Sequence, residues 1–252
     1  MKEDKLKQIK KKALEEHIPI IMDDTLFEIE KRMEKEPPKK ILEIGTAVGY
    51  SAICFSEFLA ENGKIDTIER DEERVKEAKQ NIKEMNLDDK INIYVGDAVE
   101  ILPNLDDKYD MIFIDAAKGK YPFFLAEALR MLAPNGIIFA DNILYKGYVM
   151  SDYNKHKQRT AVRNLREYIQ ETTENPLLDT EILEVGDGLA ITKLKWKITP
   201  SLIAWCYLSS ASFFEYCPIG WNSVFRGTNF SWLFFIKWLS IGISYFGVSV
   251  EE

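Results

Sequence analysis

A series of short apolar runs, each leading into a turn or a helical pattern, constrains the fold more than any other feature of the sequence. Parallel strands need helical crossovers between them, so apolar runs separated by amphipathic helices indicate βαβ units. We therefore predict an α/β fold with a mostly parallel seven-stranded sheet, an antiparallel end and helices on both faces. The strands are expected in KILEIG (40–45), KIDTIE (64–69), INIYVG (91–96), YDMIFID (109–115) and GIIFAD (136–141), and then at 180–185 and 188–194, joined through GDG.

Helical periodicity appears at the N-terminus and between the apolar runs. Leu6, Ile9, Ala13 and Leu14 recur at helical spacing and predict an amphipathic helix. A second helix is expected after Asp23-Asp24-Thr25, whose side chains suit an N-cap. Further helices are expected over 71–86 and 118–133.

Composition limits the classes of protein and the setting. The net charge of −8 argues against a uniformly basic nucleic-acid binder but leaves room for a local basic patch. Three cysteines without a Cys-x-x-Cys, and only two histidines, argue against a zinc site. The same cysteine usage indicates a reducing, cytoplasmic setting, and the charged N-terminus does not resemble a signal peptide.

Candidate ligand-binding residues follow the first three strands. Gly45 and Gly49 bracket a turn, and Ala47 replaces the middle glycine of a dinucleotide fingerprint. The turn suits a nucleoside ligand without a pyrophosphate, and a merely structural turn is the alternative. Glu69 lies 24 residues after Gly45, near the usual offset of a ribose-binding acid, although a solvated acid is the alternative. Asp97 suits either an adenine contact or a helix cap, and both interpretations stay open.

The fourth and fifth apolar runs end in Asp115 and in Asp141-Asn142. If these strands are neighbours, two carboxylates and an amide oxygen converge, and such oxygen ligands select a hard cation, Mg²⁺ or Ca²⁺. The alternative is two unrelated helix N-caps. Lys118 follows Asp115 by three residues and is either a catalytic base or a surface lysine that balances Asp115.

Together these motifs resemble the cation-dependent O-methyltransferases, which include catechol and caffeoyl-CoA O-methyltransferases. The resemblance covers roughly residues 15–195 and, within the group, is nearest to the bacterial tRNA 5-hydroxyuridine methyltransferases. The motifs that carry it are LEIGTAVGYSAI, IERD, GDA, FIDAAKGKY and ADNILYKG, in that order, with DAAKGKY and HKQRTAVRNLREY supporting the tRNA placement.

The resemblance implies a class I methyltransferase sheet, S-adenosylmethionine as methyl donor, and a dimer. It places Met22 and Ser51 in the cofactor pocket, Glu69 on the ribose and Asp97-Ala98 near the adenine. It also assigns the metal-binding role to Asp115, Asp141 and Asn142, puts Asp115 near the methionine end of the cofactor, and matches Lys118 to a catalytic lysine.

The predicted reaction is methylation of a hydroxyl that Mg²⁺ chelates together with a second oxygen on the adjacent carbon. 5-Hydroxyuridine in tRNA, which would become 5-methoxyuridine, is the expected acceptor, and a catechol-like phenol or a CoA ester is the alternative. A basic stretch supports RNA contact, with a solvated helix face as the alternative. Its members are Lys155, Lys157, Arg159, Arg163 and Arg166, and the lysine-rich N-terminus could add to their positive charge.

Other classes fit the sequence less well. A non-catalytic nucleotide-binding module needs no Asp/Asp/Asn cluster. An NAD-dependent oxidoreductase is disfavoured by Ala47, and a serine hydrolase by the absence of G-x-S-x-G.

The chain is predicted to divide into a methyltransferase domain, 1–195, and an apolar, aromatic extension, 196–252, which holds all five tryptophans. Residues 229–250 are long enough to span a bilayer, but Lys237 near their centre would be costly there. Three interpretations stay open: a membrane hairpin, an extension that docks or forms an oligomer contact, and a translated stretch never selected to fold.

Overall fold

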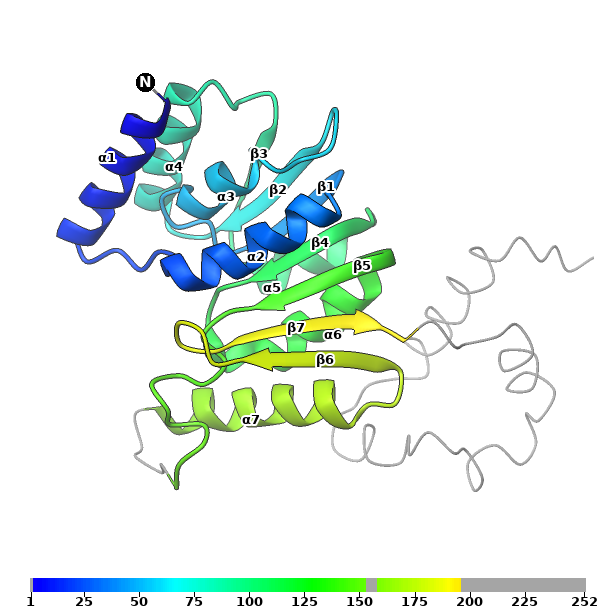
Figure 1. The fold of residues 1–252 in the computed structure, drawn as a ribbon. Coiled ribbons are helices and arrows are strands. Elements are labelled where there is room, and N and C mark those ends of the chain that lie inside the picture. Colours follow the sequence, from blue (N-terminus) through cyan, green and yellow to red (C-terminus); the bar gives the residue numbers. More distant parts are fainter. Residues whose placement is uncertain (1, 153–157, 196–252) are drawn as a thin grey trace, which may run out of the picture. The chain divides into compact units, whose positions relative to one another are not determined.

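The computed structural model describes residues 2–152 and 158–195, and its strands form one seven-stranded sheet in the order β3-β2-β1-β4-β5-β7-β6 (Figure 1). The first five strands are parallel, and β7 runs antiparallel to both β5 and β6. The strands are β1 (Lys40–Ile44), β2 (Lys64–Glu69), β3 (Ile91–Val95), β4 (Tyr109–Ile114), β5 (Leu132–Ala140), β6 (Leu178–Leu183) and β7 (Leu189–Leu194). The predicted fold class is confirmed.

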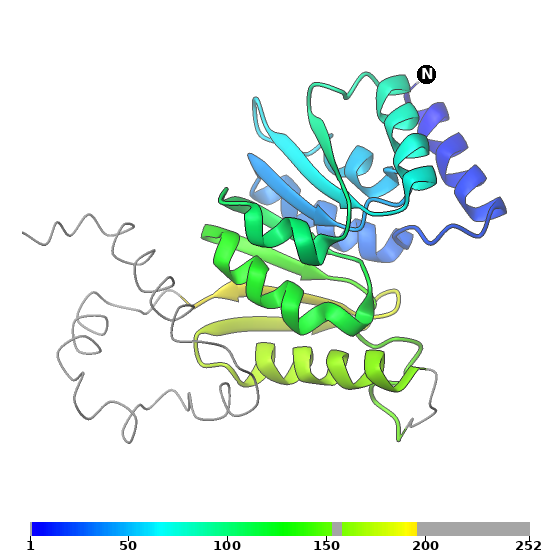
Figure 2. The same cartoon turned by 180° about the vertical axis from the view of Figure 1, so that it is seen from behind.

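Helices cover both faces of this sheet (Figures 1 and 2). Side chains alternate between two apolar layers: Ile41 packs in one layer and Leu42 in the other, as do Met111 and Ile112. The first layer includes residues of α1 to α4, and the second those of α6 and α7. The helices are α1 (Lys2–Glu15), α2 (Asp23–Lys35), α3 (Tyr50–Phe55), α4 (Glu72–Glu84), α5 (Ala98–Ile101), α6 (Tyr121–Met131) and α7 (Arg159–Glu174), with 3₁₀ turns η1 (Leu102–Asn104) and η2 (Lys118–Lys120).

Several boundaries differ from the sequence-based expectation. Helix α2 begins at Asp23, so its N-cap is Met22, whose side chain makes no capping hydrogen bond. The predicted apolar face of α1 is less buried than expected: Leu14 is 56% exposed, and Ala13 is the buried residue of this helix. Helix α6 starts at Tyr121 rather than 118, since Lys118–Lys120 form a 3₁₀ turn and Pro122 then suits the first helical turn. Strand β6 spans Leu178–Leu183 rather than 180–185.

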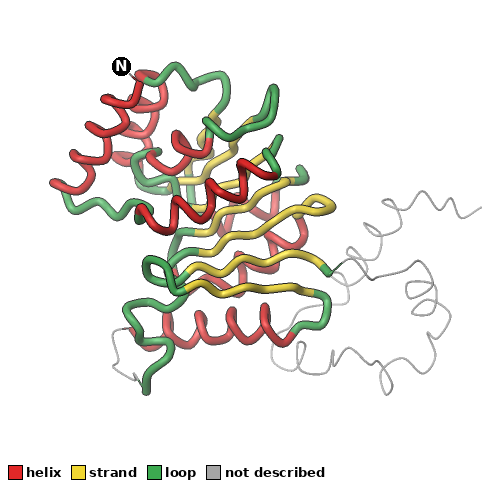
Figure 3. Tube along the Cα trace, viewed as in Figure 1, coloured by secondary structure: helices red, strands yellow, loops and turns green. Residues whose placement is uncertain are grey.

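The carboxyl ends of the central strands are tied together. The amide of Asp115 donates to Ile44 O at 3.0 Å, and the amide of Asp141 donates to Ile114 O at 3.0 Å. Residues that follow β1, β4 and β5 therefore lie at one edge of the sheet, where the loops in Figure 3 also gather. In open α/β sheets this is the edge where ligands bind.

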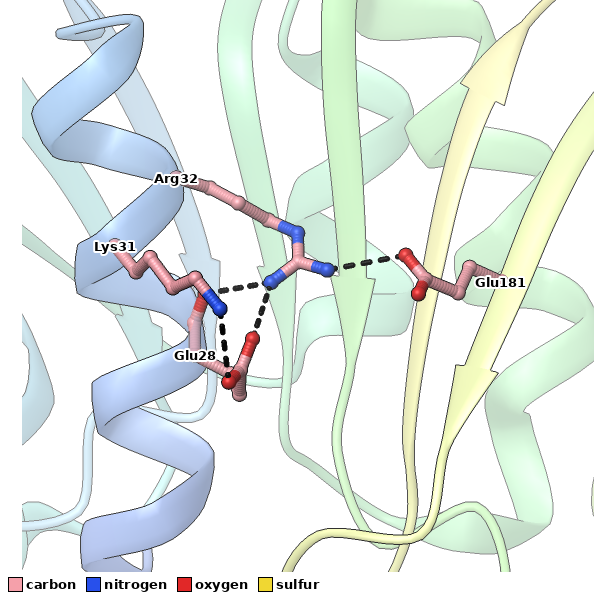
Figure 4. A network of polar contacts seen from close by, with 4 residues as sticks. All are labelled: Glu28, Lys31, Arg32 and Glu181. Carbon is pink, nitrogen blue, oxygen red and sulfur yellow. Dashed lines mark hydrogen bonds and ion pairs between the residues drawn. The ribbon is translucent and has the colours of Figure 1, made fainter.

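Helix α2 is tied to the antiparallel end of the sheet (Figure 4). Arg32 donates to Glu28 Oε2 at 2.8 Å and to Glu181 Oε2 of β6 at 3.0 Å. At the other end of α2, Asp24 Oδ2 accepts the Gly186 amide at 2.8 Å. These contacts place the start of α2 beside the β6–β7 turn.

The proposed extension, 196–252, lies outside the described residues, so its domain boundary and its alternatives stay predictions. Within the ranges that the structure describes, no helix is long and apolar enough to cross a membrane.

Candidate active site

Asp115, Lys118 and Asn142 converge beyond the ends of β4 and β5. Lys118 Nζ donates to Asp115 Oδ1 at 2.9 Å and to Asn142 Oδ1 at 2.7 Å. The side chains of Asp115 and Lys118 are only 22% and 20% exposed. Two oxygen atoms, from residues that follow two neighbouring strands, therefore already share one positive charge.

Asp141, the residue before Asn142, is almost fully buried, with 1% of its surface exposed. Its Oδ1 accepts the amide of Asn142 at 2.7 Å. Burial, followed by the charge of Asp115, raises the pKa of Asp141 to about 7. A carboxylate in this position has too little positive charge around it, because Lys118 only partly offsets the cost of burial.

This donor set suits a hard cation. Two carboxylates and an amide oxygen are ligands of the kind that Mg²⁺ and Ca²⁺ take. Among residues 2–152 and 158–195, no three His, Cys, Asp or Glu side chains gather into a metal-binding group. The predicted site therefore has two acidic ligands and needs Asn142 as its third.

Backbone geometry shapes the loop that follows Asp141. Asn142, Tyr145 and Lys146 adopt φ values of 54°, 44° and 57°. Non-glycine residues in this region cost free energy and persist only where contacts hold them. Asp187 supplies such contacts from the β6–β7 turn: its carbonyl accepts the Leu144 amide at 2.9 Å, and its Oδ1 accepts the Lys146 amide at 2.5 Å.

The predicted glycine turn lies between β1 and α3. Gly45 and Gly49 have φ values of 107° and 81°, and Gly49 is the N-cap of α3. A Cβ on Gly45 would lie 2.1 Å from the carbonyl oxygen of Asp115. The first glycine is thus required by the close approach of this turn to the end of β4.

Glu69 ends β2 and faces the glycine turn. Its Oε2 accepts the Ala47 amide at 2.9 Å, and its Oε1 accepts the amides of Arg70 and Asp71, each at 2.9 Å. This carboxylate is therefore fixed by the backbone rather than freely solvated. It joins the ends of β1 and β2.

Asp97, Ala98 and Met22 lie at the margins of this edge. Asp97 accepts the Val99 amide at 2.9 Å, so it caps α5, as one of the two interpretations expected. Asp97 and Ala98 are partly exposed and Met22 is 50% exposed. The cofactor roles of these three residues stay predictions.

A buried network beneath the glycine turn was not predicted from the sequence. Glu43, the last residue but one of β1, is fully buried and accepts hydrogen bonds from Ser51 Oγ at 2.5 Å and Thr67 Oγ1 at 2.6 Å. Thr67 also contacts Thr46 Oγ1 at 2.6 Å. Ser51, expected in the cofactor pocket, is 8% exposed and holds this carboxyl group instead of pointing freely outward.

We predict that Glu43 makes stability depend on pH. Burial raises its pKa from 4.5 to about 7, although the two hydroxyl donors favour the charged form. The folded state holds this proton more tightly, so the stabilisation is complete below the unfolded pKa and is lost as pH rises through the folded one. Between pH 5 and pH 8 the loss of this stabilisation should lower the free energy of unfolding by about 2–3 kcal/mol.

Glu43→Gln should lack this dependence. Urea unfolding of both proteins at pH 5 and pH 8 measures the effect. The free energy of unfolding of the variant, relative to that of the wild type, should rise by about 2–3 kcal/mol from pH 5 to pH 8. An unchanged difference between the two proteins at both pH values would contradict the assignment.

One member of the basic stretch, Arg166, is engaged within the protein. Arg166 donates to the carbonyls of Val149 at 2.9 Å and Tyr148 at 3.3 Å, and also to that of Ser151. Arg166 therefore supports the loop after Asn142. Arg159 and Arg163 are exposed on α7, whereas Lys155 and Lys157 lie outside the described residues.

The N-terminal lysines also face acids. Each of five lysines on α1 has an ion-pair partner within 4 Å, which lowers the positive charge that an RNA phosphate would meet. The pairs are Lys5–Glu84, Lys7–Glu3, Lys10–Asp23, Lys11–Glu15 and Lys12–Glu77.

The seven-stranded sheet, with five parallel strands and an antiparallel end, is the class I methyltransferase fold, as the comparisons with known proteins also show. Residues 4–195 match the O-methyltransferase family model, and the chain belongs to that family. The resemblance recognised in the motifs is confirmed at this level.

Individual proteins agree with the family match. The catechol O-methyltransferase of Niastella koreensis is 36% identical over 166 residues, which cover 62% of this chain and 74% of that protein. A Staphylococcus aureus structure, provisionally named a caffeoyl-CoA O-methyltransferase, has a TM-score of 0.70 and 33% identity, covering 75% of this chain and 92% of that one. A Bacillus cereus O-methyltransferase in complex with SAH has a TM-score of 0.69 and 26% identity, covering 76% and 91%. The chain is thus an enzyme that uses S-adenosylmethionine.

Proposed function

We propose that this enzyme transfers a methyl group from S-adenosylmethionine to a hydroxyl that lies beside a second oxygen atom, with Mg²⁺ held by Asp115, Asp141 and Asn142. One observation carries the proposal: oxygen atoms from the ends of β4 and β5 converge on a single positive charge, 2.9 and 2.7 Å from Lys118 Nζ. A buried third oxygen donor, Asp141, adjoins them. Simple cofactor binding does not require such a cluster.

When bound there, a divalent cation supplies Lewis acidity toward an acceptor hydroxyl. The residues of the chain supply the rest. Lys118 holds the oxygens of Asp115 and Asn142 together in the metal-free protein, and we assign to it the role of general base toward the hydroxyl. An ionised oxygen in line with the sulfonium methyl is what the transfer needs.

The cofactor would lie along the ends of β1, β2 and β4. We assign Glu69 to the ribose hydroxyls, because its carboxylate is fixed at the end of β2 by three amides. Asp97-Ala98 would border the adenine, and Gly45, Ser51 and Met22 the methionine side. Asp115 joins the two halves of the site, since it follows β4 next to Gly45.

Two acceptors have vicinal oxygens. 5-Hydroxyuridine in tRNA is supported by the sequence resemblance and by exposed Arg159 and Arg163 on α7. A small catechol-like phenol or a CoA ester is supported by the ion-paired lysines of α1, by the internal contacts of Arg166, and by relatives that are named catechol O-methyltransferases. A cytoplasmic homodimer, expected from composition and resemblance, stays a prediction.

An acceptor assay decides between them. The full chain is incubated with labelled S-adenosylmethionine, Mg²⁺ and either tRNA carrying 5-hydroxyuridine, a catechol or caffeoyl-CoA, and the products are read by mass spectrometry. A gain of one methyl on 5-hydroxyuridine, weakened by Arg159→Ala with Arg163→Ala, would support the tRNA acceptor. Transfer only to the catechol or the CoA ester would contradict it and keep the chemistry. Transfer to none of them would contradict the proposed acceptor class.

A further inference from the structure

Tyr121, the first residue of α6, links the two strands that carry the proposed metal ligands. Its side chain is fully buried. Its hydroxyl donates to the carbonyl oxygen of Asp141 at 2.7 Å and lies 3.3 Å from the carbonyl oxygen of Ile114, the residue before Asp115. One side chain thus reaches the backbone at the ends of both β4 and β5.

The position of this hydroxyl is fixed by packing of the ring. The Tyr121 ring meets Tyr168 edge-on at 5.6 Å between centroids and is tilted against Phe124 at 6.4 Å. Such contacts restrict the ring more than a lone aromatic side chain would be restricted. Lys118 Nζ lies 5.9 Å from the same ring centroid, within the range of a cation–π contact.

The contact with Asp141 is more than the satisfaction of a buried carbonyl. The Ile114 carbonyl already accepts the Asp141 amide at 3.0 Å, so β4 and β5 are paired at this level without Tyr121. The Tyr121 hydroxyl adds a second hydrogen bond, to the carbonyl group of Asp141, whereas the first involves the amide group of Asp141. Both sides of the residue that bears the buried carboxylate are then held, which limits how far that carboxylate moves relative to Asp115.

We propose that Tyr121 is a positioning residue for the metal site: its hydroxyl sets the separation of the Asp115 and Asp141 carboxylates, and its ring orients the Lys118 ammonium. This inference rests on the proposed function, because it assumes that these carboxylates bind a divalent cation. Partners that hydrogen-bond the ligating groups directly typically change metal affinity 10- to 100-fold. Tyr121 instead holds the main chain that carries the ligands, so we expect the lower end of that range, about 10-fold, when its hydroxyl is removed.

The test measures Mn²⁺ binding rather than turnover. The full chain, Tyr121→Phe and Tyr168→Phe are titrated with Mn²⁺ in the presence of SAH, and free Mn²⁺ is quantified by electron paramagnetic resonance. Tyr168→Phe is the matched control, because it also removes a buried hydroxyl, one that bonds neither Ile114 nor Asp141 in the described structure. Tyr121→Phe should raise the Kd for Mn²⁺ about 10-fold or more, with the control within about 2-fold of the wild type.

Three results would overturn the inference, and they distinguish the positioning role from the metal site. Equal Mn²⁺ affinity in Tyr121→Phe and the wild type, or equal losses in both variants, would overturn the positioning role alone. Absence of Mn²⁺ binding by the unchanged protein would overturn the metal site of the proposed function, and this inference with it. Thermal unfolding of each variant shows that the compared proteins are folded.

Discussion

Asp141→Asn is expected to lower kcat/KM about 1,000-fold, because it removes one negative ligand from the proposed cation site. A loss of this size corresponds to about 4 kcal/mol of transition-state stabilisation. The amide keeps the shape of the side chain, which is 1% exposed, so packing around the end of β5 should be preserved. Burial penalises a charge at this position, and the neutral amide should therefore leave the Tm no lower than that of the wild type.

The comparison needs a buried aspartate outside the site. Asp66 is 7% exposed and bonds Asn92 Nδ2 at 3.0 Å and Tyr109 Oη at 3.1 Å. Asp66→Asn should leave kcat/KM within a few-fold of the wild type. Initial rates with a catechol over a range of Mg²⁺ concentrations measure the effect. An Asp141→Asn enzyme with wild-type kcat/KM and Mg²⁺ dependence would contradict the role of Asp141 as a ligand.

Gly45→Ala should reduce the free energy of unfolding by several kcal/mol and weaken cofactor binding. The new Cβ would meet the carbonyl oxygen of Asp115 at 2.1 Å, a distance that no side-chain adjustment relieves because the neighbour is backbone. The φ value of 107° adds a strain that alanine tolerates poorly. The turn would have to move away from β4, and Asp115 with it.

Gly147→Ala separates strain from steric contact. Gly147 also has a positive φ, 72°, but a Cβ there would have no atom of the described residues within 4 Å. Gly147→Ala should lower the free energy of unfolding by about 1 kcal/mol, compared with several kcal/mol for Gly45→Ala. Urea unfolding gives the stabilities, and isothermal titration with SAH gives the affinities. Equal losses in the two variants would show that the contact with Asp115 is unimportant.

Much of the fold could be predicted because burial on both faces of a parallel sheet leaves continuous apolar runs. Each run from 40 to 141 corresponds to an observed strand, and the tight pairing of β4 with β5 places Asp115 and Asp141 at one edge. That pair could be predicted because consecutive parallel strands are often neighbours. The candidate metal ligands were thus predicted from strand ends, whereas the cofactor roles of Met22 and Ser51 came from the family resemblance and stay predictions.

Other features depend on contacts between distant parts of the chain. Glu43 resembled an ordinary polar residue in an apolar run, and its partners Ser51 and Thr67 come from α3 and β2. An acid flanked by apolar residues within a strand was the only signal. Arg166 lies on the predicted helix face, but periodicity does not tell what that face meets, and here it meets carbonyl groups of the loop after β5.

Metal dependence is the most direct test of the central claim. Methyl transfer from labelled S-adenosylmethionine to a catechol is followed with the full chain after treatment with a chelator, and then during titration with Mg²⁺. The account predicts that the chelator abolishes transfer, that Mg²⁺ restores it, and that Asp141→Asn shifts the restoring concentration upward. Transfer at an unchanged rate in the chelator would contradict the assignment of Asp115, Asp141 and Asn142 to a catalytic cation.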